Sequence, residues 1–412
     1  MDIKSVKKII DDTAYVRTGG SAEELKCAEY LLARCEELGM TARLESFEVQ
    51  MADISSATLE IDGESIVCKG YKCCGSGTVE APLYYLRGTD KYSLSLCKDK
   101  IVMVDGYMGY WLYHDIVENG AVGFITYDGN LNYADEDIDQ RELRAMVTKD
   151  VKKLLGVNIN AKQAVKLVEK GAENARISIE QTESTGMSHN VIADIEGEGD
   201  ETIILTAHYD STSLSKGSYD NMSGSIGILG VGEYFAKAAK KPGRNIRLVF
   251  CGSEERGLLG SKAYCEAHKS ELDKIALNIN LDMIGCIMGK FIGCCSTEEA
   301  LCKYIEYMGD ELGFGISCRQ DVYSSDSTPF ADNGVPSLSF ARLAPPNTAT
   351  IHNRYDTPAV MSPRQTVEDI AFIAAFADRM ANAVRCPVDR AIPEKVKEKL
   401  DIYNCRKRAP KN

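Results

Sequence analysis

The sequence has no long apolar run. None of its apolar stretches approaches the roughly 20 residues that a membrane-spanning helix needs. The first ten residues, MDIKSVKKII, also lack the apolar core and the small-residue cleavage site of a secretory signal peptide. We therefore expect neither a transmembrane segment nor a membrane partner, and no export signal.

The cysteines lack the spacing of a metal knuckle or a disulfide framework. Fifteen of them are scattered along 412 residues without a C-x-x-C pair, and they include the vicinal pairs Cys73-Cys74 and Cys294-Cys295. An odd and scattered set of this kind is typical of reduced thiols. The sequence therefore predicts a cytoplasmic protein.

Positive charge is also in short supply. The 48 Lys and Arg residues face 61 Asp and Glu residues, and the formal net charge is -13. This balance argues against nucleic acid or an anionic membrane as a partner. One basic run, NCRKRAPKN at the end of the chain, we interpret as a frayed tail. The oligomeric state is not indicated.

Apolar residues, by contrast, are plentiful. They make up 44% of the chain, and its length allows two or three domains. The segment SAEELKCAEYLLARCEELG predicts a helix that begins at a capping box of Ser21 and Glu24 and ends at Gly39. From about residue 52 the pattern changes to short strands and turns. We predict an N-terminal part of the main domain (1–50), an inserted domain (51–187), the main domain (188–390) and a C-terminal tail (391–412).

Strands alternate with helices from residue 188 onward. The segments TIILTA, IRLVF, ALNINL and PSLSF are typical of buried strands, and helical periodicity lies between them. Such alternation indicates a largely parallel sheet that helices cover on both faces. The predicted fold class is therefore α/β with a mostly parallel sheet.

Histidine and acidic residues cluster around the ends of these strands. They are His208 and Asp210 after TIILTA, Glu254 and Glu255 after IRLVF, Asp282 after ALNINL, Asp220 in the turn GSYDNMSGS, and His352 in the loop ATIHNRYDTP. Open α/β sheets bind ligands at the carboxyl ends of their strands. So many carboxylates at one edge are costly unless cations balance them. Imidazole and carboxylate together suit zinc, with cobalt or manganese possible.

Five short motifs in this region resemble a known family. AHYDS, SYDNMSG, GSEERGLLGS, NLDMIG and IHNRYDTP look like the metal-site signatures of the bacterial leucyl aminopeptidase family of co-catalytic zinc peptidases, which includes glutamate-carboxypeptidase-like enzymes. They occur in order, with compatible spacing, within residues 188–385. The resemblance implies a phosphorylase/hydrolase-like α/β sandwich, two zinc ions and a peptide substrate.

The same resemblance implies a role for each residue. The ligands would be His208 and Asp282 for one zinc, Glu255 and His352 for the other, and Asp220 as the bridge between them. Asp210 would orient the imidazole of His208, and Asp356 would do the same for His352.

The adjacent glutamates would divide the chemistry. Consecutive residues that leave a strand point in different directions, and spacing alone leaves open which glutamate does which. By resemblance, Glu255 faces a metal and Glu254 is the general base. Glu254 would take a proton from a metal-activated water as that water attacks the scissile carbonyl, and would then pass the proton to the leaving amine.

The sequence departs from the family pattern in one place and matches it loosely in another. Ile351 stands where some relatives carry a tyrosine that polarises the carbonyl, and Tyr219, Tyr323 or Tyr355 could replace it. The segment SSDSTPF resembles the family's loop before the last strand, where Asp326 would shape the pocket. In the insert, DKIVMVDG followed by IVENGAVGFITYDG resembles a protease-associated domain, a β-rich lid.

Three functions are compatible with these residues. An aminopeptidase would hold the substrate's α-amine with negative groups such as Glu254 and Asp282. A carboxypeptidase or an acyl-amino-acid amidase would need a cation for a substrate carboxylate, and Arg256, Arg342 and Arg354 are candidates. A non-enzymatic binding protein on a peptidase fold would have lost ligands, and none is missing here. The complete bridging set also disfavours a one-zinc cyclase. We favour the aminopeptidase.

Overall fold

The computed structural model describes residues 1–410. The chain forms two compact units, one built from residues 1–47 together with the chain from residue 187 onward, and the other from residues 48–186. No helix in the described part of the chain has both the length and the apolar composition needed to cross a membrane.

The first unit contains a largely parallel sheet with the strand order β13-β12-β14-β11-β9-β10-β8. β10, β9, β11 and β14 pair in parallel, whereas β8 and β12 pair antiparallel with β10 and β14. The strands are β8 (Asn174–Ile195), β9 (Thr202–His208), β10 (Asn245–Cys251), β11 (Ile275–Leu281), β12 (Lys290–Ser296), β13 (Ser317–Gln320) and β14 (Ser337–Leu343). The four parallel strands carry the predicted segments TIILTA, IRLVF, ALNINL and PSLSF.

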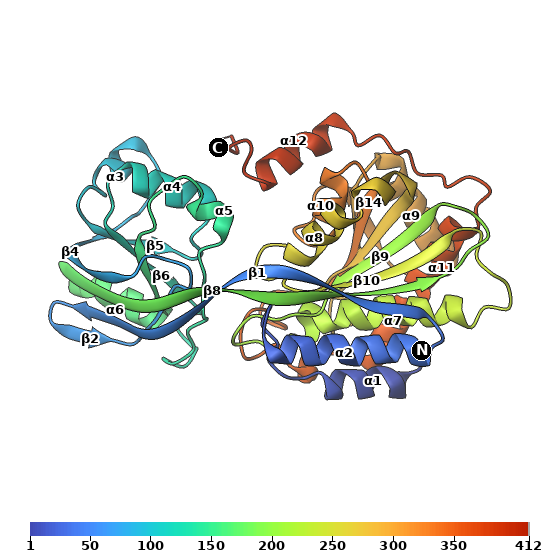
Figure 1. Ribbon diagram of the computed structural model, residues 1–412, viewed down its shortest axis with the longest axis horizontal. Helices are drawn as coiled ribbons and strands as arrows, with labels where there is room; N and C mark the ends of the chain where they lie inside the picture. Colours follow the sequence, from blue (N-terminus) through green and yellow to red (C-terminus); the bar gives the residue numbers. More distant parts are fainter. Residues whose placement is uncertain (411–412) are drawn as a thin grey trace. The chain divides into compact units, whose positions relative to one another are not determined.

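Helices cover both faces of this sheet (Figure 1). They are α1 (Ile3–Asp12), α2 (Ala22–Glu37), the π-helical turn η1 (Ser218–Met222), α7 (Ser223–Ala236), α8 (Leu259–Ala267), η2 (Lys269–Lys274), α9 (Glu299–Leu312), α10 (Ser327–Asp332), η3 (Pro358–Val360), α11 (Pro363–Asn382) and α12 (Glu394–Tyr403).

Successive residues of β9 show how both faces are buried. Ile203 and Leu205 belong to the core that includes α1, α2, α7 and α11, whereas Ile204 packs with Tyr264 of α8 and Phe330 of α10. Strand side chains alternate between faces, so a strand that is covered on both faces must be apolar at nearly every position. This accounts for the unbroken apolar runs in the sequence.

The predicted helix at residues 21–39 is α2, but its capping box is only half formed. The Ser21 hydroxyl accepts the backbone N–H of Glu24 at 3.1 Å, as predicted. The Glu24 carboxylate instead accepts the N–H of Gly20 at 2.7 Å through Oε2. Its other oxygen, Oε1, points into the protein interior.

The end of the chain differs from the predicted tail. Residues 394–403 form α12, and Val396 and Leu400 pack against Ala331. The Lys399 ammonium also lies 2.6 Å from the Asp321 carboxylate. The apolar residues recur at helical spacing, so this segment buries one face.

The second unit has its own core and its own parallel strands. β4, β5, β6 and β7 are parallel neighbours, with β3 antiparallel at the β7 side and β8 antiparallel at the β4 side. Its elements are β1 (Thr41–Ile61), β2 (Glu64–Ile66), β3 (Cys68–Gly70), β4 (Gly77–Tyr85), α3 (Lys91–Ser95), β5 (Ile101–Asp105), α4 (Tyr110–Glu118), β6 (Gly123–Asp128), α5 (Ala145–Thr148), β7 (Leu155–Asn160) and α6 (Ala161–Lys170). The predicted β-rich insert is thus a mixed α/β unit, because α4 connects the parallel strands β5 and β6.

Candidate metal centre

Three neighbouring parallel strands deliver the charged residues to one edge of the sheet. His208 is the last residue of β9, and Asp282 directly follows β11. Glu254 and Glu255 follow β10, whose last residue, Cys251, is the register partner of His208. Because parallel strands end at the same edge, residues far apart in the sequence meet there.

The five predicted ligands form two groups that share Asp220. In one group, the Nε2 atom of His208 lies 3.2 Å from Asp220 Oδ1 and 3.8 Å from Asp282 Oδ1. In the other, the Nε2 atom of His352 lies 3.1 Å from Asp220 Oδ2 and 3.1 Å from Glu255 Oε2. Asp220 therefore presents a different oxygen to each histidine, as a bridging carboxylate would.

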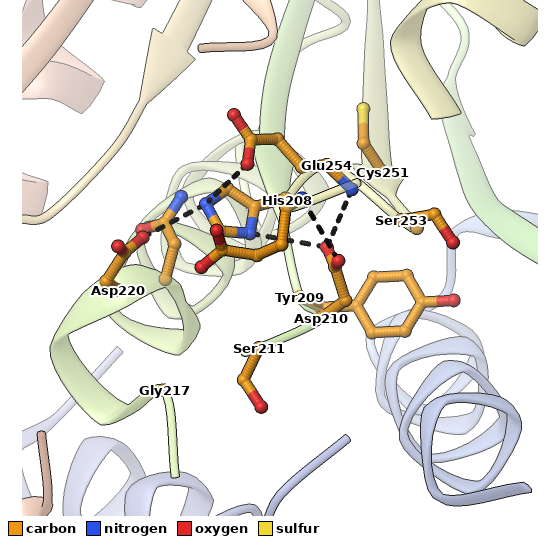
Figure 2. Close-up of polar contacts among 12 residues, drawn as sticks. His208, Tyr209, Asp210, Ser211, Gly217, Asp220, Cys251, Ser253 and Glu254 are labelled. Atoms are coloured by element: carbon orange, nitrogen blue, oxygen red, sulfur yellow. Dashed lines mark hydrogen bonds and ion pairs between the residues drawn. The ribbon is translucent and has the colours of Figure 1, made fainter. Parts of the chain in front are cut away.

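Asp210 holds three parts of the site at once. Its carboxylate lies 3.4 Å from Nδ1 of His208 and accepts the backbone N–H groups of Glu254 at 2.9 Å and of Glu255 at 3.2 Å. Figure 2 shows Asp210 on one side of the His208 ring and Asp220 and Glu254 on the other. Asp210 thus lies beside the imidazole of His208 and also holds the backbone where both glutamates follow β10.

Asp356 supports the backbone around Asp220 in a comparable way. Its carboxylate accepts the backbone N–H of Tyr219 at 2.7 Å and that of Asp220 at 3.1 Å, and it also accepts the hydroxyl of Ser215. The family resemblance implied that Asp356 would orient His352. The structure directs it to the Asp220 loop instead, because that loop packs against the buried carboxylate.

Arg17 supports the same loop from the segment that joins α1 and α2. Its guanidinium is fully buried and donates to the backbone carbonyls of Tyr209, Lys216 and Gly217, which lie between His208 and Asp220. This role of Arg17 was not predicted, because no local sequence pattern separates it from an ordinary surface arginine.

The electrostatics of the centre reflect its crowded negative charge. Burial, and then the charge of Asp220, raises the pKa of Asp282 to about 7. Burial also raises the pKa of Glu254 well above its usual value. Burial alone would raise the pKa of Asp220 too, but hydrogen bonds from His208 and His352 hold it well below its usual range.

These residues fit divalent cations. Imidazole nitrogen and carboxylate oxygen are zinc ligands in proteins, and each group brings three such atoms within 4.8 Å of one another. Asp282 Oδ1 is buried and has no hydrogen-bond partner in the described residues. A buried carboxylate oxygen without a partner is costly, and a cation held between His208, Asp220 and Asp282 would satisfy it.

The three tyrosines proposed in place of Ile351 lie in different surroundings. The Tyr219 hydroxyl donates to the carbonyl of Arg342 at 2.6 Å and accepts the N–H of Ala344, so it serves the backbone. The side chain of Tyr355 is 44% exposed. The pKa of Tyr323 is raised by burial and then by the charge of ligand residues, Asp282 foremost. Tyr323 therefore lies close enough to Asp282 for the charge of that carboxylate to affect it.

Two residues close to the centre are buried in its walls. Asp326 is completely buried at the start of α10, and burial raises its pKa to about 6. Because its side chain is buried, Asp326 can influence the shape of the site only through the residues that pack around it. Cys251 is also fully buried, as expected for a small hydrophobic residue.

Asp220→Ala tests the shared ligand. Because both groups lose a carboxylate oxygen, we expect the variant to lose both metal ions, as measured by elemental analysis after zinc loading and dialysis. The exposed Asp273→Ala is the control and should keep the metal content of the unchanged protein. An unaltered metal count in Asp220→Ala, with a native circular dichroism spectrum, would reject the bridging role.

Comparison with known proteins agrees with this geometry. Residues 190–377 match the model of peptidase family M28. The chain is 25% identical to aminopeptidase YwaD of Bacillus subtilis (strain 168) over 361 residues, which are 83% of this chain and 75% of that protein.

Solved structures show the same α/β fold. A zinc aminopeptidase from Bacillus subtilis matches with a TM-score of 0.76 at 21% identity, covering 91% of this chain and 95% of that one. An aminopeptidase from Aneurinibacillus sp. strain AM-1 matches with a TM-score of 0.73 at 22% identity, covering 94% and 96%. The predicted fold class is therefore confirmed. The residues that match the model of peptidase family M28, 190–377, include the strands and loops that carry every predicted ligand.

Proposed function

We propose that this protein is a metallo-aminopeptidase that releases N-terminal residues from peptides with two bound zinc ions. The observation that carries the proposal is the pair of ligand groups joined by Asp220, with Glu254 beside them. Cobalt or manganese could replace zinc, since the same nitrogen and oxygen ligands bind these ions.

The described residues suit hydrolysis of a peptide bond. Two divalent ions held by His208, Asp220, Glu255, Asp282 and His352 would supply Lewis acidity and lower the pKa of a water to about 7. Glu254 belongs to neither ligand group, and its carboxylate lies 3.9 Å from the His208 ring. It would accept a proton from the attacking water and give that proton to the leaving amine.

The position of Glu254 supports its role as the base. Its backbone N–H is held by Asp210, so the side chain starts from a fixed point. Burial raises the pKa of its carboxyl group, so Glu254 retains a proton more readily than a surface glutamate does. A group that takes up a proton and then hands it on needs this property.

The arginines argue against a carboxypeptidase. The Arg342 guanidinium is bound to the buried Asp369, 2.5 Å away, and also donates to the carbonyl of Gly289. Arg256 donates to the carbonyl of Gly19. Arg354 stacks over the ring of Tyr355. All three candidate cations thus contact other parts of the protein, while the negative groups that would attract an α-amine remain.

We assign the missing carbonyl-polarising group to Tyr323. Burial and then the charges of Asp282 and Asp220 raise its pKa, which supports a position near these carboxylates. A hydroxyl donor aimed at the carbonyl oxygen stabilises the negative charge that develops there during attack.

Two further assignments belong to this proposal. The unit of residues 48–186 would be a protease-associated domain, supported by its β5-α4-β6 succession of strand, helix and strand. The protein would work in the cytoplasm, supported by its fifteen free thiols.

Glu254→Gln tests the general base. The amide has the same shape but cannot accept the proton, so we expect turnover to fall about 10²- to 10⁴-fold while metal content stays unchanged. Steady-state kinetics with a chromogenic aminoacyl substrate, alongside elemental analysis, measures both quantities. Glu266→Gln, an exposed change on α8, serves as the control. Normal turnover in Glu254→Gln would remove this residue from the mechanism.

Tyr323→Phe tests the carbonyl-polarising hydroxyl. Removing one donor to the developing charge should lower kcat by about 100-fold and leave metal binding intact. Tyr355→Phe is the matched control, because it removes the hydroxyl of the competing candidate, and it should keep nearly full activity. The reverse pattern would transfer the role to Tyr355.

A panel of peptides with free and N-acetylated termini tests the proposed function itself. We expect mass spectrometry to show stepwise loss of N-terminal residues from the free peptides and no cleavage of the acetylated ones, because the enzyme would require the α-amine. Loss of C-terminal residues would favour the carboxypeptidase, and release of acetyl groups the amidase. Binding without cleavage would favour the non-enzymatic alternative.

A further inference from the structure

Glu24 is a buried acidic residue that the mechanism above does not use. It lies in the first turn of α2 and is completely buried. Its Oε1 atom accepts the hydroxyls of Ser188 at 2.6 Å and of Ser253 at 3.3 Å, and its Oε2 atom accepts the N–H of Gly20. The carboxylate therefore connects α2 to the loop that follows β10.

Ser253 stands immediately before the general base. Its φ angle is 54°, a left-handed conformation that residues other than glycine rarely adopt. Figure 2 shows its hydroxyl pointing away from His208, and that hydroxyl also lies 2.8 Å from the hydroxyl of Ser188. Such a conformation persists only where the surroundings hold it. Glu24 and Ser188 are those surroundings.

The backbone around Glu24 is closely packed against the loop that follows β10. A Cβ atom added at Gly252 would lie 2.7 Å from Glu24 Oε1 and 2.4 Å from the carbonyl of His189. One added at Gly19 would lie 2.3 Å from the Ser253 hydroxyl. The turn between β10 and Glu254 is therefore closely packed against Glu24 and its neighbours.

A carboxylate at this place is costly to folding. Its partners are two hydroxyls and a backbone N–H rather than a lysine or an arginine. Burial, and then the charge of Asp210, raises the pKa of Glu24 to about 7. A group whose pKa is raised by folding destabilises the native state above its unfolded pKa, so stability alone does not account for the residue.

We propose that Glu24 is a positioning residue for the two active-site glutamates. Through Ser253 it fixes the turn after β10, so that Glu254 lies beside His208 while Glu255 lies beside His352. The inference rests on the proposed function, since it assigns Glu254 and Glu255 their places in that reaction.

Glu24→Ala removes the acceptor and frees the turn. We expect kcat to fall and the affinity for Co²⁺ to weaken, each by about 10- to 100-fold, while KM changes by no more than about threefold because substrate contacts remain. Steady-state kinetics gives kcat and KM, and titration of metal-free protein followed by Co²⁺ absorption gives the affinity. Glu24→Gln keeps an acceptor for the Gly20 N–H and a polar partner for the two serine hydroxyls. This variant should therefore retain most of the kcat and most of the Co²⁺ affinity. The exposed Glu23→Ala on the same helix is the control.

A double-mutant cycle separates this role from general destabilisation. Glycine adopts a positive φ without strain, and Ser253→Gly also removes the hydroxyl that Glu24 accepts. If Glu24 acts through Ser253, adding Glu24→Ala to Ser253→Gly should lower kcat by less than about threefold further, because coupled residues are not additive. Fully multiplicative losses would overturn the proposal. So would a Glu24→Ala variant with unchanged kcat and Co²⁺ affinity.

Ser253→Ala covers the case in which Glu24→Ala does not fold. This variant keeps the carboxylate and loses the bond to the loop, so it should show the same fall in kcat and Co²⁺ affinity. Unchanged values would refute the positioning role. The Co²⁺ titration does not depend on peptidase activity. A wild-type protein that cleaves no peptide would therefore defeat the proposed function, while the titration still decides the role of Glu24.

Discussion

Negative charge crowded at one sheet edge is the constraint on which the rest of the site depends. The parallel strands β9, β10 and β11 end side by side, and each ends at or just before a residue with an ionisable side chain. Burial raises the pKa of a carboxylate at this edge, and the charge of a neighbouring carboxylate raises it further, as Asp282 shows. In the proposed function, two divalent cations would resolve this conflict and would at the same time provide the reactive centre of a peptidase. The crowded carboxylates are therefore the source both of the unfavourable repulsion and of the proposed chemistry.

The protein positions its ligands largely through backbone N–H groups that buried carboxylates accept. Asp210 accepts from Glu254 and Glu255, and Asp356 accepts from Tyr219 and Asp220. In each case a carboxylate outside the ligand set fixes the main chain from which a ligand projects. This arrangement sets the direction of a side chain before any metal arrives, and outer partners of this kind commonly tune a metal site.

The predictions that were correct rest on local sequence patterns. Those that were wrong depend on contacts between segments that are far apart in the sequence. The helix α2 and the four parallel strands follow from local periodicity and were predicted correctly. The resemblance implied that Asp356 would orient His352, but the structure turns its carboxylate to the Asp220 loop. Residues 394–403 were expected in a tail, and they form a helix because Val396 and Leu400 find an apolar partner surface that the segment itself does not reveal.

The sequence by itself determined the chemistry. Histidine and acidic residues at the ends of apolar strands are a local pattern, and parallel strands must bring such ends to one edge. Only the tertiary structure decided what holds these residues in place. Glu24 looks like half of a capping box, yet it contacts Ser253, 229 positions further along the chain. A local pattern specifies the element in which a residue lies, whereas the partner of a buried polar side chain depends on how distant segments pack.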